Sequence, residues 1–264
     1  MAWIKRILGL LIISLLSGCT LLGTYMDPQN PAPKYYVDNR VVRVSYVQLT
    51  PTWVLNHNAV PTYRVGPYDI LNIIVWGHPE LTTVTTQLST PGESGFLVSA
   101  HGRISFPFAG TFTVAGLTLP EIQTRIEHRI SKYIRNPQVT ARVVGFRSQE
   151  AQLLGEVGMQ KTIRLNDKPT TLLDALNSVG GTTVLSANTT KIYVIRGNVS
   201  HLTVYALNAK SPETMMVAQQ FFLRNNDIVY VPPLAITNWN RVISQLLPTF
   251  SVPGTVKGTI TSFE

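Results

Sequence analysis

The chain has 264 residues and a formal net charge of +8, yet only 14 % of its residues are charged. That length suffices for one large domain or two small ones. Uncharged polar residues fill the surface instead, which suits contact with glycans or other subunits, and the basic excess favours an acidic polysaccharide or lipid phosphates as partners. The absence of a Lys/Arg-rich run argues against a nucleic-acid partner.

Residues 1–18 have the pattern of a secretory signal peptide, in which basic residues precede a short apolar stretch. A Ser-Gly pair stands directly before Cys19, the only cysteine of the chain. This resembles the bacterial lipobox, which implies that the thiol of Cys19 is the lipidation site and that the chain is cut before it. A plain transmembrane anchor is the alternative, but the stretch is shorter than the about 20 apolar residues that a spanning helix needs. Thr20, in place of an aspartate, favours the outer membrane.

Residues 19–61 are rich in proline, and Pro28, Pro31, Pro33, Pro51 and Pro61 oppose long regular structure. We therefore expect a lipidated N-terminal tether that lies over the body of the protein. The segment from Val41 to Val47 is the exception, because its β-branched residues predict one strand.

A first domain is predicted over residues 62–147. A strand from Asp69 to Trp76 follows a Gly-Pro turn, and a hairpin pairs residues 96–98 with residues 103–106. Thr118 with Glu121 three positions on forms a capping box, which predicts a helix start. The helix should bury an apolar stripe, and a strand with alternating burial follows it. The stripe consists of Ile122, Ile126, Ile130 and Tyr133.

A second domain is predicted over residues 148–233. Its strands are expected near residues 152–157, 162–165, 192–196, 202–205 and 227–231. A short helix begins near Thr170 and stops at the Gly180-Gly181 pair, as helices with glycine at the C-terminus do. Together the two domains predict an α+β fold.

Residues 234–250 predict an amphipathic helix, because apolar and polar residues separate cleanly at 100° per residue. Its polar face has one charge, Arg241, where a solvated helix normally has several. A helix packed on its own domain is the ordinary alternative. Its length of roughly 25 Å comes close to a thin outer membrane, so a ring of such helices could cross it. The apolar, membrane-facing set is Ile236, Trp239, Val242, Ile243, Leu246, Leu247 and Phe250, and the lumen-facing set is Asn238, Arg241 and Gln245.

The sequence contains no pattern that predicts catalysis, a cofactor or a metal site. Asp69 is better explained as a turn cap than as a catalytic acid, and residues 92–95 do not match a nucleophile elbow. The histidines lack metal-ligand spacing; they are His57, His78, His101, His128 and His201. An enzyme acting on glycans is therefore the weaker class. We expect residues 251–264 to form a flexible tail.

The order of these motifs resembles the outer-membrane polysaccharide export family, the Wza-like proteins. Residues 63–73 (YRVGPYDILNI) resemble the opening of its export domain, and residues 99–107 resemble its central hairpin. Residues 155–181 resemble the start of its soluble-ligand-binding β-grasp (SLBB) domain, and residues 238–241 lie where its C-terminal membrane helix begins. The resemblance covers roughly residues 63–250.

The resemblance implies a homo-oligomeric ring, commonly of eight subunits in Wza itself, with a periplasmic body and an α-helical barrel through the outer membrane. Capsular or extracellular polysaccharide would pass through the lumen without catalysis, above an inner-membrane polysaccharide co-polymerase or tyrosine autokinase. Only one β-grasp unit is evident here, so the periplasmic cavity should be shorter than in Wza. The alternative is a periplasmic glycan-binding or scaffold lipoprotein without a pore of its own.

Overall fold

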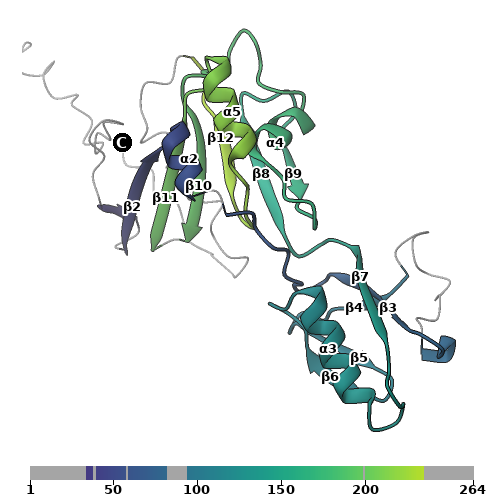
Figure 1. The fold of residues 1–264 in the computed structure, drawn as a ribbon. Coiled ribbons are helices and arrows are strands. Elements are labelled where there is room, and N and C mark those ends of the chain that lie inside the picture. Colours follow the sequence, from purple (N-terminus) through teal and green to yellow (C-terminus); the bar gives the residue numbers. More distant parts are fainter. Residues whose placement is uncertain (1–33, 38–39, 58, 82–93, 199, 235–264) are drawn as a thin grey trace, which may run out of the picture. The chain divides into compact units, whose positions relative to one another are not determined.

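The computed structural model describes residues 34–234 apart from 38–39, 58, 82–93 and 199. The described residues form a mixture of helices and strands, which confirms the α+β class (Figure 1). In chain order the elements are β1 (Lys34–Val37), β2 (Arg40–Gln48), α2 (Pro51–His57), β3 (Ile70–Val75), the 3-10 helix η1 (Pro79–Leu81), β4 (Phe96–Leu97), β5 (Arg103–Phe106), β6 (Gly110–Thr113), α3 (Leu119–Ile130), β7 (Val139–Gly145), β8 (Glu150–Gly155), β9 (Lys161–Arg164), α4 (Leu172–Ser178), β10 (Ile192–Asn198), β11 (His201–Leu207), α5 (Pro212–Gln220) and β12 (Ile228–Val231).

A large sheet joins the N-terminal strands to those of the second domain. Its order is β1-β2-β11-β10-β12-β8-β9, with β2 parallel to β11, β12 parallel to β8 and the remaining pairs antiparallel. Helices α2, α4 and α5 share one apolar core with this sheet (Figure 1). Val54 of α2, Leu172 of α4 and Val217 of α5 are almost completely buried in that core.

The expected strand between Val41 and Val47 is confirmed as the central part of β2. The structure differs from the tether expectation over residues 34–57, because β2 makes a six-residue parallel register with β11. Pro51 does not break structure there. It occupies the first position of α2, where a missing N–H is harmless, and the backbone N–H of Trp53 donates to the Thr50 hydroxyl at 3.2 Å.

The first domain has its own core, formed where α3 packs against short strands. β3 lies between β4 and β7 in one sheet, and β5 pairs with β6 in a separate hairpin. Ile122, Ile126 and Ile130 of α3 are fully buried against this core, as the apolar stripe predicted. Glu121 accepts hydrogen bonds from the backbone N–H and the hydroxyl group of Thr118, at 2.7 and 2.9 Å. The helix start predicted from these two residues is therefore confirmed.

Two expectations for this domain are wrong. Residues 96–97 pair with β3 and not with residues 103–106, whose partner is β6. The intervening turn does form, since the N–H of Ser99 donates to the carbonyl of Arg103, but it connects two different sheets. Tyr133 does not continue the buried stripe: α3 ends at Ile130, so helical periodicity no longer applies, and Tyr133 is 66 % exposed.

Candidate functional site

The predicted lipidation and membrane residues lie outside the described residues. They are Cys19, Ile236, Asn238, Trp239, Arg241, Val242, Ile243, Gln245, Leu246, Leu247 and Phe250. Among the helices that the structure describes, none is both long and apolar enough to span a bilayer.

Asp69 organises the segment that opens the first domain. Its side chain is fully buried and accepts from the hydroxyl of Tyr63 at 2.7 Å and the N–H of Gly66 at 2.9 Å. It also accepts from the N–H groups of Arg147 and Ser148, each at 2.9 Å, and from the Ser148 hydroxyl at 2.8 Å. Five donors on one carboxylate satisfy a buried charge. The turn-cap interpretation of Asp69 is thus confirmed, and the residue also holds a segment far along the chain.

Tyr63 completes this arrangement. Burial raises the pKa of its phenol above the ordinary value, with an opposing effect from the Ser148 hydrogen bond and a further rise from Asp69. The hydroxyl therefore stays protonated and donates to the Asp69 carboxylate. Its ring packs edge-on against Phe146, with the ring centroids 5.1 Å apart. Tyr63, the first residue of the YRVGPYD motif, thus helps to hold the Asp69 carboxylate in place.

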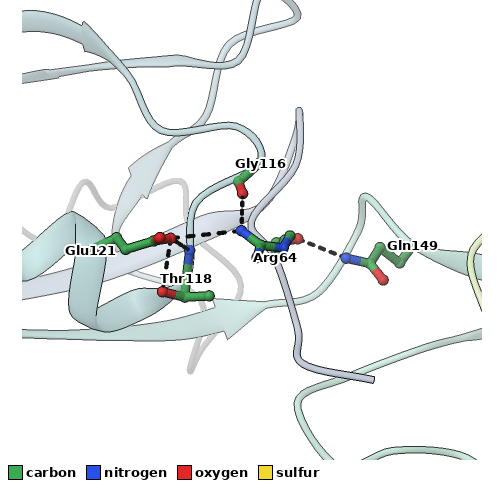
Figure 2. A network of polar contacts seen from close by, with 5 residues as sticks. All are labelled: Arg64, Gly116, Thr118, Glu121 and Gln149. Atoms are coloured by element: carbon green, nitrogen blue, oxygen red, sulfur yellow. Dashed lines mark hydrogen bonds and ion pairs between the residues drawn. The ribbon is translucent and has the colours of Figure 1, made fainter. Parts of the chain in front are cut away.

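Arg64 links the same segment to the start of α3 (Figure 2). Its guanidinium donates to the carbonyl of Gly116 at 2.7 Å and lies 3.7 Å from the Glu121 carboxylate. Its own carbonyl accepts from the side-chain amide of Gln149 at 2.6 Å. Both charged side chains are more than half exposed, so the ion pair itself contributes little stability. The contacts of Arg64 instead hold the segment before β3 against the start of α3 and against Gln149.

A second buried charge lies in the core of the large sheet. Arg196 on β10 donates two hydrogen bonds to Asp227, at 2.8 and 2.7 Å, and a third to the carbonyl of Phe222. Burial alone would lower the pKa of Arg196, but the hydrogen bonds and charge of Asp227 outweigh it and raise that pKa. The guanidinium also lies 5.2 Å from the ring centroids of Tyr205 and Phe221. The pair of Arg196 and Asp227 therefore links β10 to the residue that precedes β12.

Two cavities open on the second domain and its N-terminal extension. One of about 700 Å³ lies beside the edge strand β9, and its cations Lys161, Arg164 and Lys168 accompany the carboxylate of Asp174. The other, of about 170 Å³, lies beside Trp53 and Arg196. Two of its lining side chains already have partners, since Arg196 pairs with Asp227 and the Trp53 ring stacks on His57 with the ring centroids 4.5 Å apart.

A third cavity, of about 490 Å³, lies beside α3 in the first domain, and we call it the α3 cavity. The sequence analysis did not predict this cavity, because it placed Tyr133 in the buried apolar stripe. The signal that could have found it is the basic spacing on the helix, since positions 125, 128, 129 and 132 repeat at three and four residues. Its walls are formed by Phe108, Arg125, His128, Arg129, Lys132 and Tyr133.

The fold thus defines an α+β protein with two cores, whose polar networks position backbone segments. Comparison with known protein families assigns these segments in order. Residues 57–144 match the polysaccharide biosynthesis/export protein model, residues 149–231 match the SLBB domain, and residues 235–263 match the outer-membrane lipoprotein Wza C-terminal domain. The chain belongs to the Wza-like outer-membrane polysaccharide export family.

Relatives with related names support this assignment. The EPS I polysaccharide export outer membrane protein EpsA of Ralstonia solanacearum is 28 % identical, over 93 % of this chain and 94 % of the relative. The capsule polysaccharide export outer membrane protein CtrA of Neisseria meningitidis is 28 % identical over 64 % of this chain and 43 % of its own length. The capsule polysaccharide export protein BexD of Haemophilus influenzae is 26 % identical over 61 % and 41 %. The family and the outer-membrane location expected from the sequence are confirmed.

Proposed function

We propose that this protein is an outer-membrane lipoprotein that assembles into a homo-oligomeric ring and exports capsular or extracellular polysaccharide without catalysing a reaction. The observation that carries the proposal is the order of the three family matches, with a C-terminal outer-membrane segment after the export and SLBB domains. The names of the relatives all refer to polysaccharide export.

The membrane anchor in this proposal has two parts. The thiol of Cys19 carries lipid after removal of residues 1–18. Residues 234–250 form an amphipathic helix whose apolar face meets lipid, while Asn238, Arg241 and Gln245 face a hydrated lumen. Amide and hydroxyl groups along the lumen exchange hydrogen bonds with sugar hydroxyls, so the chain passes without tight binding.

The body of the ring is shorter than that of a protein with two β-grasp units. One SLBB match supports this. The alignment with the Ralstonia relative runs over 359 positions whereas this chain has 264 residues, so many residues of the relative have no counterpart here. An inner-membrane polysaccharide co-polymerase, or a tyrosine autokinase, docks beneath the ring.

Electron microscopy of the detergent-solubilised protein tests the ring and the pore together. The expected result is ring-shaped particles with closed rotational symmetry and density across the detergent belt. Particles without a membrane-spanning part would instead favour the alternative, a glycan-binding or scaffold lipoprotein without its own pore.

A double variant tests the helix. Ile243→Asp with Leu246→Asp places two charges on the proposed lipid face, which opposes insertion, so surface polysaccharide should be lost. The matched control is Thr237→Asp with Ser244→Asp on the proposed polar face, which adds the same charge and should retain export. Normal surface polysaccharide from the first variant would contradict the role of this helix as a pore.

A further inference from the structure

The α3 cavity joins two unusual features, an exposed pair of aromatic rings and a concentration of positive charge. Phe108 and Tyr133 are 57 % and 66 % exposed, and their ring centroids are 5.3 Å apart. One ring comes from the turn between β5 and β6, and the other follows the C-terminus of α3. Neither ring contributes to the buried core of the domain.

The backbone at Phe108 is held in an unfavourable conformation. Its φ is +60°, in the left-handed region that a bulky residue rarely adopts. Glycine or asparagine would fit this turn at less cost. Because the Phe108 side chain is more than half exposed, little burial offsets this strain. Strained positions of this kind gather at functional sites. The strain presents an aromatic ring at the rim of the α3 cavity.

The cations around the rings are only partly occupied. Arg125 donates to the carbonyl of Thr113 at 3.0 Å, and Arg129 donates to the carbonyl of Ala109 at 3.2 Å. A guanidinium has five N–H donors, so each retains donors for a ligand. Within the described part of the chain, the side chains of His128 and Lys132 make no hydrogen bond or ion pair. The residues that line the α3 cavity include no carboxylate, in contrast to the cavity beside β9.

We propose that the α3 cavity binds a carboxylated glycan. The rings offer flat apolar faces for the C–H side of a sugar, and arginine and lysine are suited to its carboxylate groups. A hollow between the rings and the helix suits a saccharide. A lipid bilayer would instead need an extended apolar surface on the protein. Charge complementarity selects acidic over neutral glycans.

Two acidic glycans can present this chemistry in the periplasm. One is the exported polysaccharide, if it carries uronic or other acidic sugars. The other is the peptidoglycan of the cell wall, whose free carboxylates belong to the stem peptides attached to its sugars. Only the first source rests on the proposed export function, so the site and the channel can be tested separately.

The binding test uses the full-length protein in detergent and an oligogalacturonate as a defined carboxylated probe, with its methyl ester as the uncharged control. Calorimetry should detect the acid and not the ester. Tyr133→Ala and Lys132→Glu should each weaken binding about tenfold, a change of about 1.4 kcal/mol, while Tyr133→Phe should retain it. Lys168→Glu makes the same charge change beside β9 and should have no effect.

Both substituted side chains are exposed, and an unchanged melting temperature would verify folding. The proposal would be overturned if the wild-type protein binds the acid and the ester equally well, or if Tyr133→Ala and Lys132→Glu both bind the acid as well as the wild type does. The proposal would also be overturned if the wild-type protein does not bind the acidic probe but does bind phosphatidylglycerol vesicles or an acidic peptide, and if the same variants lose that binding.

Two further assays identify the source. Sedimentation with purified sacculi measures retention by peptidoglycan, and binding of the purified surface polysaccharide measures contact with the exported chain. Loss of either one in Lys132→Glu supports the site and names its glycan. A protein that binds the probe but forms no ring would refute the channel and leave the α3 cavity assignment intact.

Discussion

The carboxylate of Asp69 and the hydroxyl of Ser148 are 2.8 Å apart, although 79 positions separate them in the chain. Asp69 opens the first domain, and Ser148 lies between the residues that match the export and SLBB models. One buried charge therefore fixes the path by which the chain enters and leaves this domain. Gly66 is part of the same contact, because a Cβ there would collide with the side chain of Ser148.

Replacing Asp69 should destabilise the first domain strongly. The variant Asp69→Asn presents an amide group toward N–H donors, so at least one buried donor loses its acceptor, at a cost of about 1–3 kcal/mol. Hydrogen exchange should show faster exchange at the amides of Arg147 and Ser148. Ser148→Ala removes a single donor and should cost less. Equal stability of Asp69→Asn and the wild type would contradict this assignment.

The pair of Arg196 and Asp227 predicts a second stability effect. Asp227 is completely buried, so Asp227→Ala leaves the guanidinium without its partner, and removing one member of a buried pair costs about 3–5 kcal/mol. Thermal unfolding followed by circular dichroism measures the change. In the double variant Arg196→Met with Asp227→Ala, the loss should be smaller than for Asp227→Ala alone, because no unpaired charge remains. An equal or larger loss would show that packing, not charge, dominates.

The pairing of β2 with β11 makes the N-terminal segment part of the second core. Ser45 lies opposite Thr203 in this register. Ser45→Pro removes a backbone donor and fixes φ inside a central strand, which proteins tolerate poorly. Hydrogen exchange in β11 should accelerate, whereas Ser45→Thr should leave it unchanged. Unaltered hydrogen exchange in the proline variant would contradict the conclusion that β2 is an integral strand of the large sheet.

Glu121 predicts a dependence of stability on pH. Hydrogen bonds from the backbone N–H and then the hydroxyl of Thr118 lower the pKa of this exposed carboxyl, with smaller help from the charges of Arg64 and Arg125. The unfolded chain therefore binds more protons, so the contribution is present above the unfolded pKa of 4.5 and is lost as the pH falls through the folded value. Glu121→Gln should lower the melting temperature at about pH 7 and converge with wild type near pH 2–3.

The control for this pH series is Glu213→Gln on α5. Within the described residues the side chain of Glu213 makes no hydrogen bond or ion pair, and its carboxylate interacts only with the N-terminus of α5. The difference between this variant and the wild type should therefore change less with pH than the difference for Glu121→Gln. A melting-temperature difference for Glu121→Gln that stays constant down to the acid end would mean that the carboxylate contributes through shape alone.

The sequence predicted elements whose signals are local and failed where tertiary contacts decide. The capping residues Thr118 and Glu121 and the spacing of Ile122 and Ile126 suffice to locate α3, since each signal acts within one or two turns. Strand pairing is not local: the sequence predicts that residues 96–97 pair with the next segment along the chain, whereas their partner in the structure is β3.

Helices α2 and α5 were missed for a different reason. Both begin with a hydroxyl residue followed by proline, Thr50-Pro51 and Ser211-Pro212, which is a helix-start signal. Proline opposes regular structure in most positions and favours a helix only in its first turn, so Pro51 and Pro212 each allow two interpretations from the sequence alone. The buried pairing of Arg196 with Asp227 could not be foreseen, because a turn residue and a strand residue 31 positions apart meet only in the folded sheet.

The incorporation of β2 into the large sheet also sets a length. The first strand that the structure describes begins at Lys34, about 15 positions after Cys19, and a chain of that length spans at most roughly 50 Å when fully extended. A tether that ran to residue 61 would reach nearly three times as far. Under the proposed lipidation, this short connection limits the distance between β1 and the membrane surface in each subunit, before any ring has formed.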